Sequence, residues 1–214
     1  MAISVNQTSN QTGNATANTF NLTLSAGSNL VLVVMVAGDS NIDTSSITWG
    51  GVALTKRVDQ ATGATDETIW TLDDPATGNA DLVVNQPGTT RFAAGIIVFA
   101  GANTHAGSNT ANGLSTAATV TLATTGTGNG FVVACLNWVE KAANTITYAG
   151  DGTEFFTNTD ANDSYQAFAY DDYSSGADVT SDWTKSATDK AWGIATLEIT
   201  EALPSSGFFF AVDR

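Results

Sequence analysis

The sequence predicts an all-β protein: an antiparallel, jelly-roll-like β-sandwich of about twelve strands built from two pseudo-repeated halves. Short apolar runs alternate with turns rich in Gly, Asn, Asp and Ser. Charged residues make up only 13%, and Thr, Asn, Ser and Gly, which suit strands and turns, take their place. No stretch shows the apolar period of an amphipathic helix. The third observation is an internal repeat.

The order of elements repeats along the chain. The apolar run Leu30–Ala37 is followed by a turn and by the pattern Ile47-Thr48-Trp49-x-Gly51. The same succession returns at Phe131–Trp138 and Ile146-Thr147-Tyr148-x-Gly150, where the second pattern lies 99 positions after the first. We interpret this as an internal duplication, which makes Trp49 and Tyr148 equivalent packing residues.

Each half contributes a similar set of strands. Residues 19–24 alternate apolar and polar, which predicts a half-buried strand, whereas the continuous run at 30–37 predicts a strand buried on both faces. Further strands are expected at 47–49, 52–58, 68–72, 81–85, 91–100, 119–122, 131–138, 146–148 and 165–170. In this alignment Phe168 takes the position of Trp70, and the pair Asp171-Asp172 takes that of Asp73-Asp74.

The predicted domain plan has three parts. Residues 1–18, rich in Asn, Gln, Thr and Ser, form a flexible N-terminal arm or a weak first strand. Residues 19–202 form the β-sandwich, with pseudo-repeats at about 19–102 and 114–202 joined by a loop-like stretch. Two packings fit: one sandwich whose two sheets share strands from both halves, which we favour, or two small sandwiches in tandem. Residues 203–214 form a C-terminal tail.

Charge and targeting signals exclude several classes of function. The formal net charge is −14, from 21 acidic and 7 basic residues, which argues against nucleic-acid binding through phosphates. The longest apolar run is too short to span a bilayer, so no membrane insertion is expected. The N-terminus lacks the regions of a signal peptide, which predicts synthesis in a cytoplasm without classical export. Cys135 is the only cysteine and is expected to be a buried, small apolar residue.

No set of residues resembles a catalytic centre. The only histidine, His105, falls in the loop-like stretch between the halves, and no Gly-x-Ser-x-Gly pattern surrounds a serine. The adjacent pairs Asp73-Asp74 and Asp171-Asp172 sit at predicted turns, where carboxylates accept backbone N–H bonds. We therefore expect no enzyme activity, no catalytic residue and no organic cofactor.

Two weaker kinds of binding site are suggested. Asp160, Asn162 and Asp163 place oxygen ligands in one acidic loop, an incomplete pattern for Ca²⁺ that lacks the glycine and distal glutamate of an EF-hand. Trp183 and Trp192 are candidates for stacking on sugar rings, with core packing as the alternative.

The tail ends in an apolar cluster. Phe208, Phe209 and Phe210 follow the turn-forming stretch Leu203–Gly207. Three consecutive phenylalanines are unfavourable in water, so they either fold back on their own sandwich or dock on another subunit.

Four stretches of the first half resemble a β-sandwich type found in tailed-phage and environmental viral proteins. These are Leu30–Ala37, Ile47–Thr55, Glu67–Val84 and Ala93–Ala102. The resemblance covers Phe20–Ala102 well and the second half loosely. It implies a concanavalin-type jelly roll of the kind used as head decoration or fibre domains on virions, and it brings no catalytic motif.

The function expected from the resemblance and from the composition is a non-enzymatic virion structural protein. It would be a capsid decoration or cement protein of a bacteriophage, or a spike or fibre component, and would form a homo-oligomer with contacts to other virion proteins. On this interpretation Phe208, Phe209 and Phe210 hold the partner. The alternative is a carbohydrate-binding module or adhesin-like lectin that recognises surface glycans.

Overall fold

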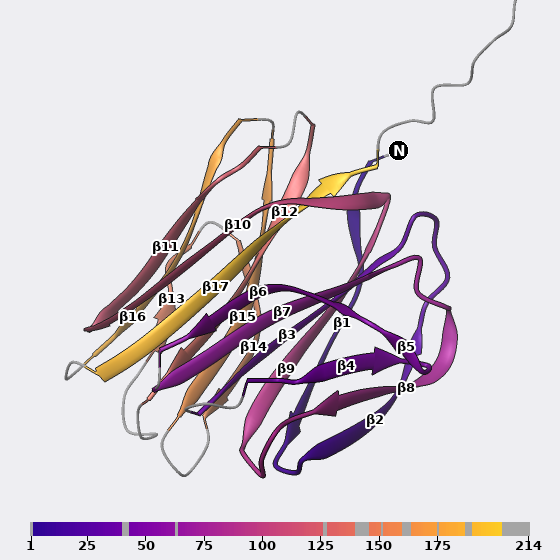
Figure 1. Ribbon diagram of the computed structural model, residues 1–214. Helices are drawn as coiled ribbons and strands as arrows, with labels where there is room; N and C mark the ends of the chain where they lie inside the picture. Colours follow the sequence, from indigo (N-terminus) through magenta and orange to yellow (C-terminus); the bar gives the residue numbers. More distant parts are fainter. Residues whose placement is uncertain are drawn as a thin grey trace, which may run out of the picture.

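The predicted fold class is confirmed, with more strands than expected. The computed structural model describes residues 2–39, 43–62, 64–125, 128–139, 146–150, 152–159, 164–174, 176–186 and 190–202. Within these ranges the chain forms 17 strands, all paired antiparallel, and no helix (Figure 1). In the same ranges nothing helical has the length and apolarity needed to cross a membrane.

The first half of the chain forms two sheets. Its strands are β1 (Ser4–Gly13), β2 (Ala17–Leu24), β3 (Val31–Asp39), β4 (Ser46–Trp49), β5 (Val52–Ala53), β6 (Thr55–Ala61), β7 (Thr65–Asp73), β8 (Gly78–Asn85) and β9 (Phe92–Ala100). Sheet A has the order β1-β9-β3-β7-β6, and sheet B has the order β2-β8-β4-β5. We call sheets A and B the first sandwich.

The second half repeats this plan. Its strands are β10 (Ala102–Ser115), β11 (Ala117–Ala123), β12 (Gly130–Trp138), β13 (Ile146–Tyr148), β14 (Thr153–Thr159), β15 (Tyr165–Tyr173), β16 (Asp178–Lys185) and β17 (Lys190–Glu201). Sheet C has the order β10-β17-β12-β15-β14, and sheet D has the order β11-β16-β13. We call sheets C and D the second sandwich.

The two sandwiches have the same topology. Each half has eight strands when the short hairpin strand β5 is left out. If these are numbered 1 to 8 in chain order within each half, the larger sheet has the order 1-8-3-6-5 and the smaller sheet has the order 2-7-4 in both halves. This interleaving of early and late strands across two sheets is a jelly-roll pattern. The order of eight strands recurs in both halves, so the repeat seen in the sequence is also a repeat of topology.

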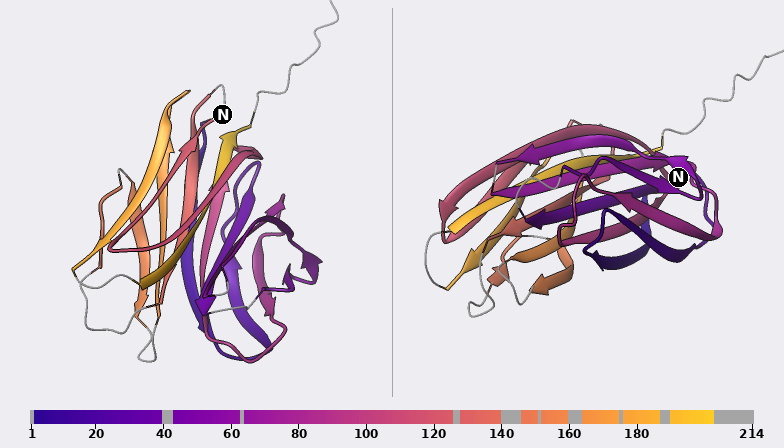
Figure 2. Two further views of the ribbon diagram at one scale, coloured as in Figure 1. Left: turned by 60° about the vertical axis from the view of Figure 1, so that its left-hand side comes forward. Right: turned by 60° about the horizontal axis from the view of Figure 1, so that its bottom comes forward.

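The four sheets stack in the order B, A, C, D (Figure 2). One buried cluster fills the space between sheets B and A, a second joins sheets A and C, and others lie between C and D. Strand β3 shows why its apolar run has no alternation. Val34 faces the first cluster and Val33 faces the second, so both faces of the strand are buried.

The expectation that both halves share two sheets is therefore wrong. Among the described residues no sheet contains strands of both halves, and sheets A and C instead pack face to face. The physical reason is that each half has more strands than expected, because residues 1–18 were expected to form a flexible arm or a weak first strand and the stretch between the halves to form a loop. Eight main strands are enough to enclose a core within each half.

The N-terminal arm and the central loop are strands. Residues 4–13 pair along their length with β9, and residues 102–115 pair with β17. Their polar side chains act locally: Gln7 Nε2 donates to the Thr23 carbonyl at 2.9 Å, and Asn109 Nδ2 donates to the Thr121 carbonyl at 2.7 Å. These bonds join each first strand to the second strand of its half. The polar residues of these two segments therefore belong to edge strands whose side chains bond to a neighbouring strand, and not to a loop.

The predicted equivalence of Phe168 in β15 with Trp70 in β7 is wrong, because the two side chains lie on opposite faces of their strands. Trp70 packs inside the first sandwich, whereas Phe168 faces the other sandwich across the interface of sheets A and C. Because side chains alternate along a strand, an error of one position exchanges the two faces. The aspartates differ as well: Asp73 is exposed, and Asp171 is buried in β15, where it accepts a bond from the Tyr148 hydroxyl at 2.8 Å.

Candidate functional site

The two tryptophans predicted to stack on glycans are buried. Trp183 is 0% exposed and donates from Nε1 to Glu154 Oε1 at 2.9 Å, and Trp192 is 7% exposed and donates to the Ser115 hydroxyl at 2.9 Å. Both belong to the cluster between sheets C and D. Neither offers a ring face to a sugar, because β16 and β17 turn these positions inward. The core-packing alternative is correct for both.

The predicted calcium ligands and docking residues lie outside the described residues. Asp160, Asn162 and Asp163, the Ca²⁺ candidates, and Phe208, Phe209 and Phe210, the docking candidates, fall in ranges that the structure does not describe. His105 lies in β10, where its backbone pairs with Ile199. Cys135 is fully buried, as predicted.

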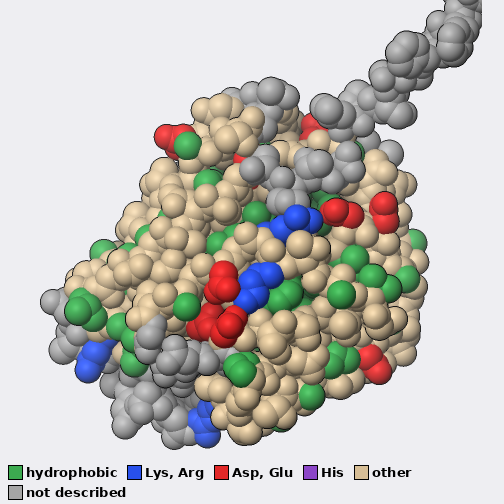
Figure 3. Space-filling model, in the orientation of Figure 1, with side chains coloured by type: hydrophobic (Ala, Val, Ile, Leu, Met, Phe, Trp, Pro, Cys, Tyr) green, Lys and Arg blue, Asp and Glu red, His purple; other side chains and the backbone are tan. Residues whose placement is uncertain are grey.

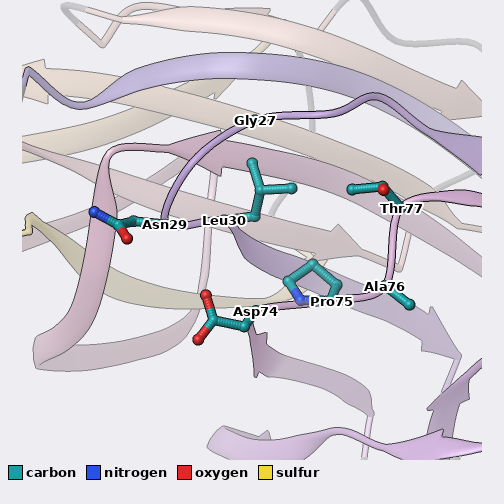
Figure 4. Close-up of a pocket in the computed structure, with 7 residues that line it drawn as sticks. All are labelled: Gly27, Asn29, Leu30, Asp74, Pro75, Ala76 and Thr77. Carbon is teal, nitrogen blue, oxygen red and sulfur yellow. The ribbon is translucent and has the colours of Figure 1, made fainter.

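A surface pocket of about 290 Å³ lies between the loop from β2 to β3 and the loop from β7 to β8 (Figure 4). The residues that line it are Gly27, Asn29, Leu30, Asp74, Pro75, Ala76 and Thr77. The Asp74 N–H donates to the Leu30 carbonyl at 2.8 Å, and the buried Trp49 donates from Nε1 to the Ala76 carbonyl at 2.8 Å. These bonds tie both loops to each other and to the core.

Two residues with left-handed backbone flank the pocket. Asn29 has φ of 49° and Asp74 has φ of 50°, a conformation that asparagine and aspartate tolerate better than other residues with a β-carbon. The pocket presents one carboxylate, one amide and one hydroxyl beside proline and leucine carbons. It can hydrogen-bond a small polar molecule, and its lining holds no nucleophile paired with a base. The sequence predicted the turns but not the pocket.

A buried polar cluster lies where sheets A and C meet. Glu67 of β7 is fully buried, its Oε1 has no hydrogen-bond partner among the described residues, and the Thr65 hydroxyl donates to its Oε2 at 3.5 Å. A β-carbon on Gly193 of β17 would collide with the Glu67 carboxyl, so this glycine makes room for it. Burial raises the pKa of Glu67 well above its usual range, and the charge of Asp66 adds to this.

Amides from the second sandwich extend this cluster. Asn137 Nδ2 donates to the Gly38 carbonyl across the interface. Gln166 Nε2 donates to Asn137 Oδ1 at 3.4 Å, and Asn158 Nδ2 donates to Gln166 Oε1 at 3.0 Å. The interface of sheets A and C is therefore apolar along most of its length and polar at one end. The alternation of side chains along a strand predicts that Glu67 and Ile69 share a face of β7. The internal duplication gave no reason to expect that this face is buried against the second half of the chain.

A small cluster of acidic and basic side chains lies near the middle of the face shown in Figure 3, which is otherwise made mostly of uncharged side chains with a few scattered charges. Lys56 Nζ bridges Asp43 Oδ1 at 2.7 Å and Asp59 Oδ2 at 3.0 Å and lies 5.2 Å from the centre of the Trp70 ring. Burial raises the pKa of Asp66 to about 6, opposed by the Asp43 N–H that it accepts. The described part of the chain contains no group of three or more His, Cys, Asp or Glu side chains that could hold a metal ion.

A half-buried apolar strip runs along one side of the interface of sheets A and C. Its residues are Ile3, Val5, Phe131, Phe155, Phe156 and Tyr170, all packed against the shared cluster. The Phe131 ring lies 6.0 Å from the Tyr170 ring, and the Phe155 ring lies 6.0 Å from the same ring. We call these six residues the aromatic strip. The consecutive phenylalanines 155 and 156 were visible in the sequence, but their shared face was not.

A β-bulge explains how two neighbouring phenylalanines reach one cluster. Glu154 pairs with Ala169 and Phe156 pairs with Phe168, which leaves Phe155 as an extra residue in β14. The Phe155 and Phe156 rings then both lie near Phe168, at 6.2 Å and 5.5 Å between ring centres. Without the bulge, alternation would place them on opposite faces.

Comparison with known proteins gives no relative from which a function could be transferred. No protein-family profile, no curated protein and no solved structure matches the chain. The geometry described above is therefore the basis for the function proposed below.

Proposed function

We propose that the chain is a non-enzymatic structural protein of a virion surface, either a capsid decoration or cement protein or a component of a spike or fibre. The observation that carries the proposal is the fusion of two jelly-roll sandwiches through a shared buried cluster into one stack of four sheets. A body built in this way is stiff, because the apolar faces of both large sheets are held against each other. Its surface is rich in uncharged polar side chains (Figure 3).

In this proposal the chain attaches through its tail and acts as a homo-oligomer on the particle. Phe208, Phe209 and Phe210 are the docking residues, because apolar side chains near a chain end can be inserted into a partner without disturbing the parent fold. The resemblance of residues 20–102 to virion sandwiches supports the same assignment.

The test is whether the chain travels with particles. Virus particles from the source sample are purified by density gradient and examined by mass spectrometry. The proposal expects peptides of this chain in the fraction that contains capsids. Recovery only from soluble fractions would contradict it.

The buried positions of Trp183 and Trp192 remove the sugar-stacking residues of the alternative expected from the sequence, a carbohydrate-binding module or adhesin-like lectin.

A further inference from the structure

The four edges of sheets A and C differ in how they are protected. An edge strand exposes unpaired backbone N–H and C=O groups, to which another strand can add unless something blocks it. Side chains of β1 and β10 bond to the neighbouring strands β2 and β11 and cover those two edges. Strand β6, at the third edge, carries Lys56, Arg57 and Asp59, and charges of this kind discourage strand addition.

Strand β14, at the fourth edge, carries no lysine or arginine. Among the described strands it pairs with β15 alone. Its one charged residue, Glu154, accepts a bond from the buried Trp183. The strand instead carries Phe155 and Phe156, which together with Tyr170 and Phe131 form most of the aromatic strip. An edge strand paired on one side, beside half-buried aromatic side chains, is a combination that strand-addition sites use.

We propose that β14 is the docking edge for the C-terminal segment of a second copy of this chain. Residues 208–212, Phe-Phe-Phe-Ala-Val, add to β14 as an extra strand, and their aromatic side chains cover the strip. This inference rests on the proposed docking role of the tail and identifies its receptor.

Distance permits either the chain's own tail or the tail of another copy. From the end of β17, an added strand beyond β14 lies four strand positions away, past β12, β15 and β14. At about 4.8 Å per position this is roughly 19 Å. The seven residue steps from Glu201 to Phe208 span at most about 25 Å when fully extended. The chain's own tail can therefore reach the near end of such a strand.

Strand direction distinguishes the two tails. The end of β17 lies level with the start of β12, because Thr200 pairs with Gly130. It lies close to the start of β14, because Thr153 is level with Leu197 through Tyr170 and Val133. A tail leaving from this end can only run parallel to β14 within its own copy. A second copy can present its tail in the antiparallel direction, which is the direction of every other pair in the sheet.

Reciprocal exchange closes the assembly. Each copy has one tail and one β14 edge, so two copies related by a two-fold axis satisfy both sites and leave neither open. The expected species is a dimer that depends on the tail and on β14.

The experiment separates tail donors from tail acceptors. The acceptor is the chain cut after Ala202, which retains every described strand but has no tail. The donor is the full chain with Thr153→Lys and Thr157→Lys, two exposed threonines of β14 replaced by charges. The control carries Thr55→Lys and Ala61→Lys at exposed positions of the already charged strand β6. Phe155→Ser is a further variant that keeps the edge and weakens the strip.

Masses in solution are measured by size-exclusion chromatography with light scattering, and thermal unfolding checks that each variant is folded. The wild type and the β6 control should be dimers, whereas the donor and the acceptor should each be monomers. An equimolar mixture of donor and acceptor should form a complex with one copy of each. Phe155→Ser should raise the dimer dissociation constant at least tenfold.

Other outcomes overturn the inference in distinguishable ways. A donor that dimerises like the wild type, while the acceptor stays monomeric, would place the tail on another surface and leave the docking role of the tail intact. A monomeric wild type, or an acceptor that dimerises like the wild type, would overturn both this inference and the proposed role of the tail.

Discussion

At the scale of single residues, the interface between the sandwiches depends on two glycines that receive large side chains. Gly95 of β9 packs against the side chain of Phe168, and Gly193 of β17 packs against the side chain of Glu67. Each sandwich therefore supplies one glycine and one large side chain to these two contacts. Sheets A and C can approach closely only because these two positions lack a β-carbon.

Gly95→Ala tests this close approach. An added β-carbon would lie 2.6 Å from Cγ of the fully buried Phe168, so one of the sheets has to shift. We expect a loss of about 1–3 kcal/mol in the free energy of unfolding, measured by urea denaturation. Gly88→Ala is the control, because its nearest atom would be 3.9 Å away, and it should change stability by less than about 0.5 kcal/mol. Equal effects at both positions would contradict the account.

Glu67→Gln tests the buried carboxyl. The folded protein raises the pKa of Glu67, so its contribution to stability is complete below the unfolded value of about 4.5 and is lost as pH rises toward the folded value. Because glutamine has no charge to suppress, the variant should be more stable than the wild type at pH 8 by more than about 1 kcal/mol.

The measurement for Glu67→Gln is urea denaturation at pH 4 and at pH 8. The two proteins should be close in stability at pH 4 and diverge at pH 8. Asp178→Asn, at an exposed position, controls for the general effect of removing an acid. The same difference between variant and wild type at both pH values would show that the Glu67 carboxyl does not titrate in this range.

At the scale of elements, β1 is part of the body and not an arm. It pairs along its length with β9, and Ile3 and Val5 pack against the cluster that joins sheets A and C. Ser25 donates its backbone N–H to Gln7 Oε1 at 3.1 Å, which closes the same edge from the side of β2. Ile3 and Val5 therefore complete the interface and contribute two of the six residues of the aromatic strip.

Removal of residues 1–13 distinguishes a strand from a flexible arm. The loss of two half-buried aliphatic side chains and of the β9 pairing should lower the melting temperature by about 10 °C, measured by circular dichroism. A flexible arm would leave it unchanged. Removal of residues 203–214 is the matched deletion, and because it takes away no described strand it should shift the melting temperature by less than about 2 °C.

The sequence predicts apolar strands well and polar strands poorly. The runs that became β3 and β12 were clear because each buries both faces, and Trp49 was correctly expected to be a packing residue. Strand β1 was expected only as a flexible arm or a weak first strand, and β10 as a loop. Their outward side chains are Asn, Gln, Ser and Thr, whose bonds to a neighbouring backbone leave no periodic signal. The face of Phe168 was wrong by one position, because low similarity between the halves does not fix register.

The candidate sites show the same division. The burial of Trp183 and Trp192 depends on which face of β16 and β17 points inward, and a local pattern rich in polar residues does not determine that face. The β14 edge is recognisable only once the partners of every strand are known, because the sequence does not show which strands lie at the edges of a sheet.

At the scale of the whole molecule, the chain has the geometry of a dimer contained in one polypeptide. Two sandwiches of equal topology face each other through their larger sheets, with β7 packed on β17 and β3 packed on β12. Because the two repeated halves pack against each other, the apolar faces of their larger sheets are buried within one chain. Further assembly must then use the surfaces that remain, and in our proposal these are the tail and the β14 edge.

The central claim is that the chain is a structural protein that assembles through its tail. The most direct measurement is the molar mass in solution, by light scattering, of the full chain and of the chain cut after Ala202, at matched concentrations. We predict a multiple of 22.0 kDa for the full chain and a folded monomer for the shortened one. A monomeric full chain, or a shortened chain that assembles equally well, would contradict the account.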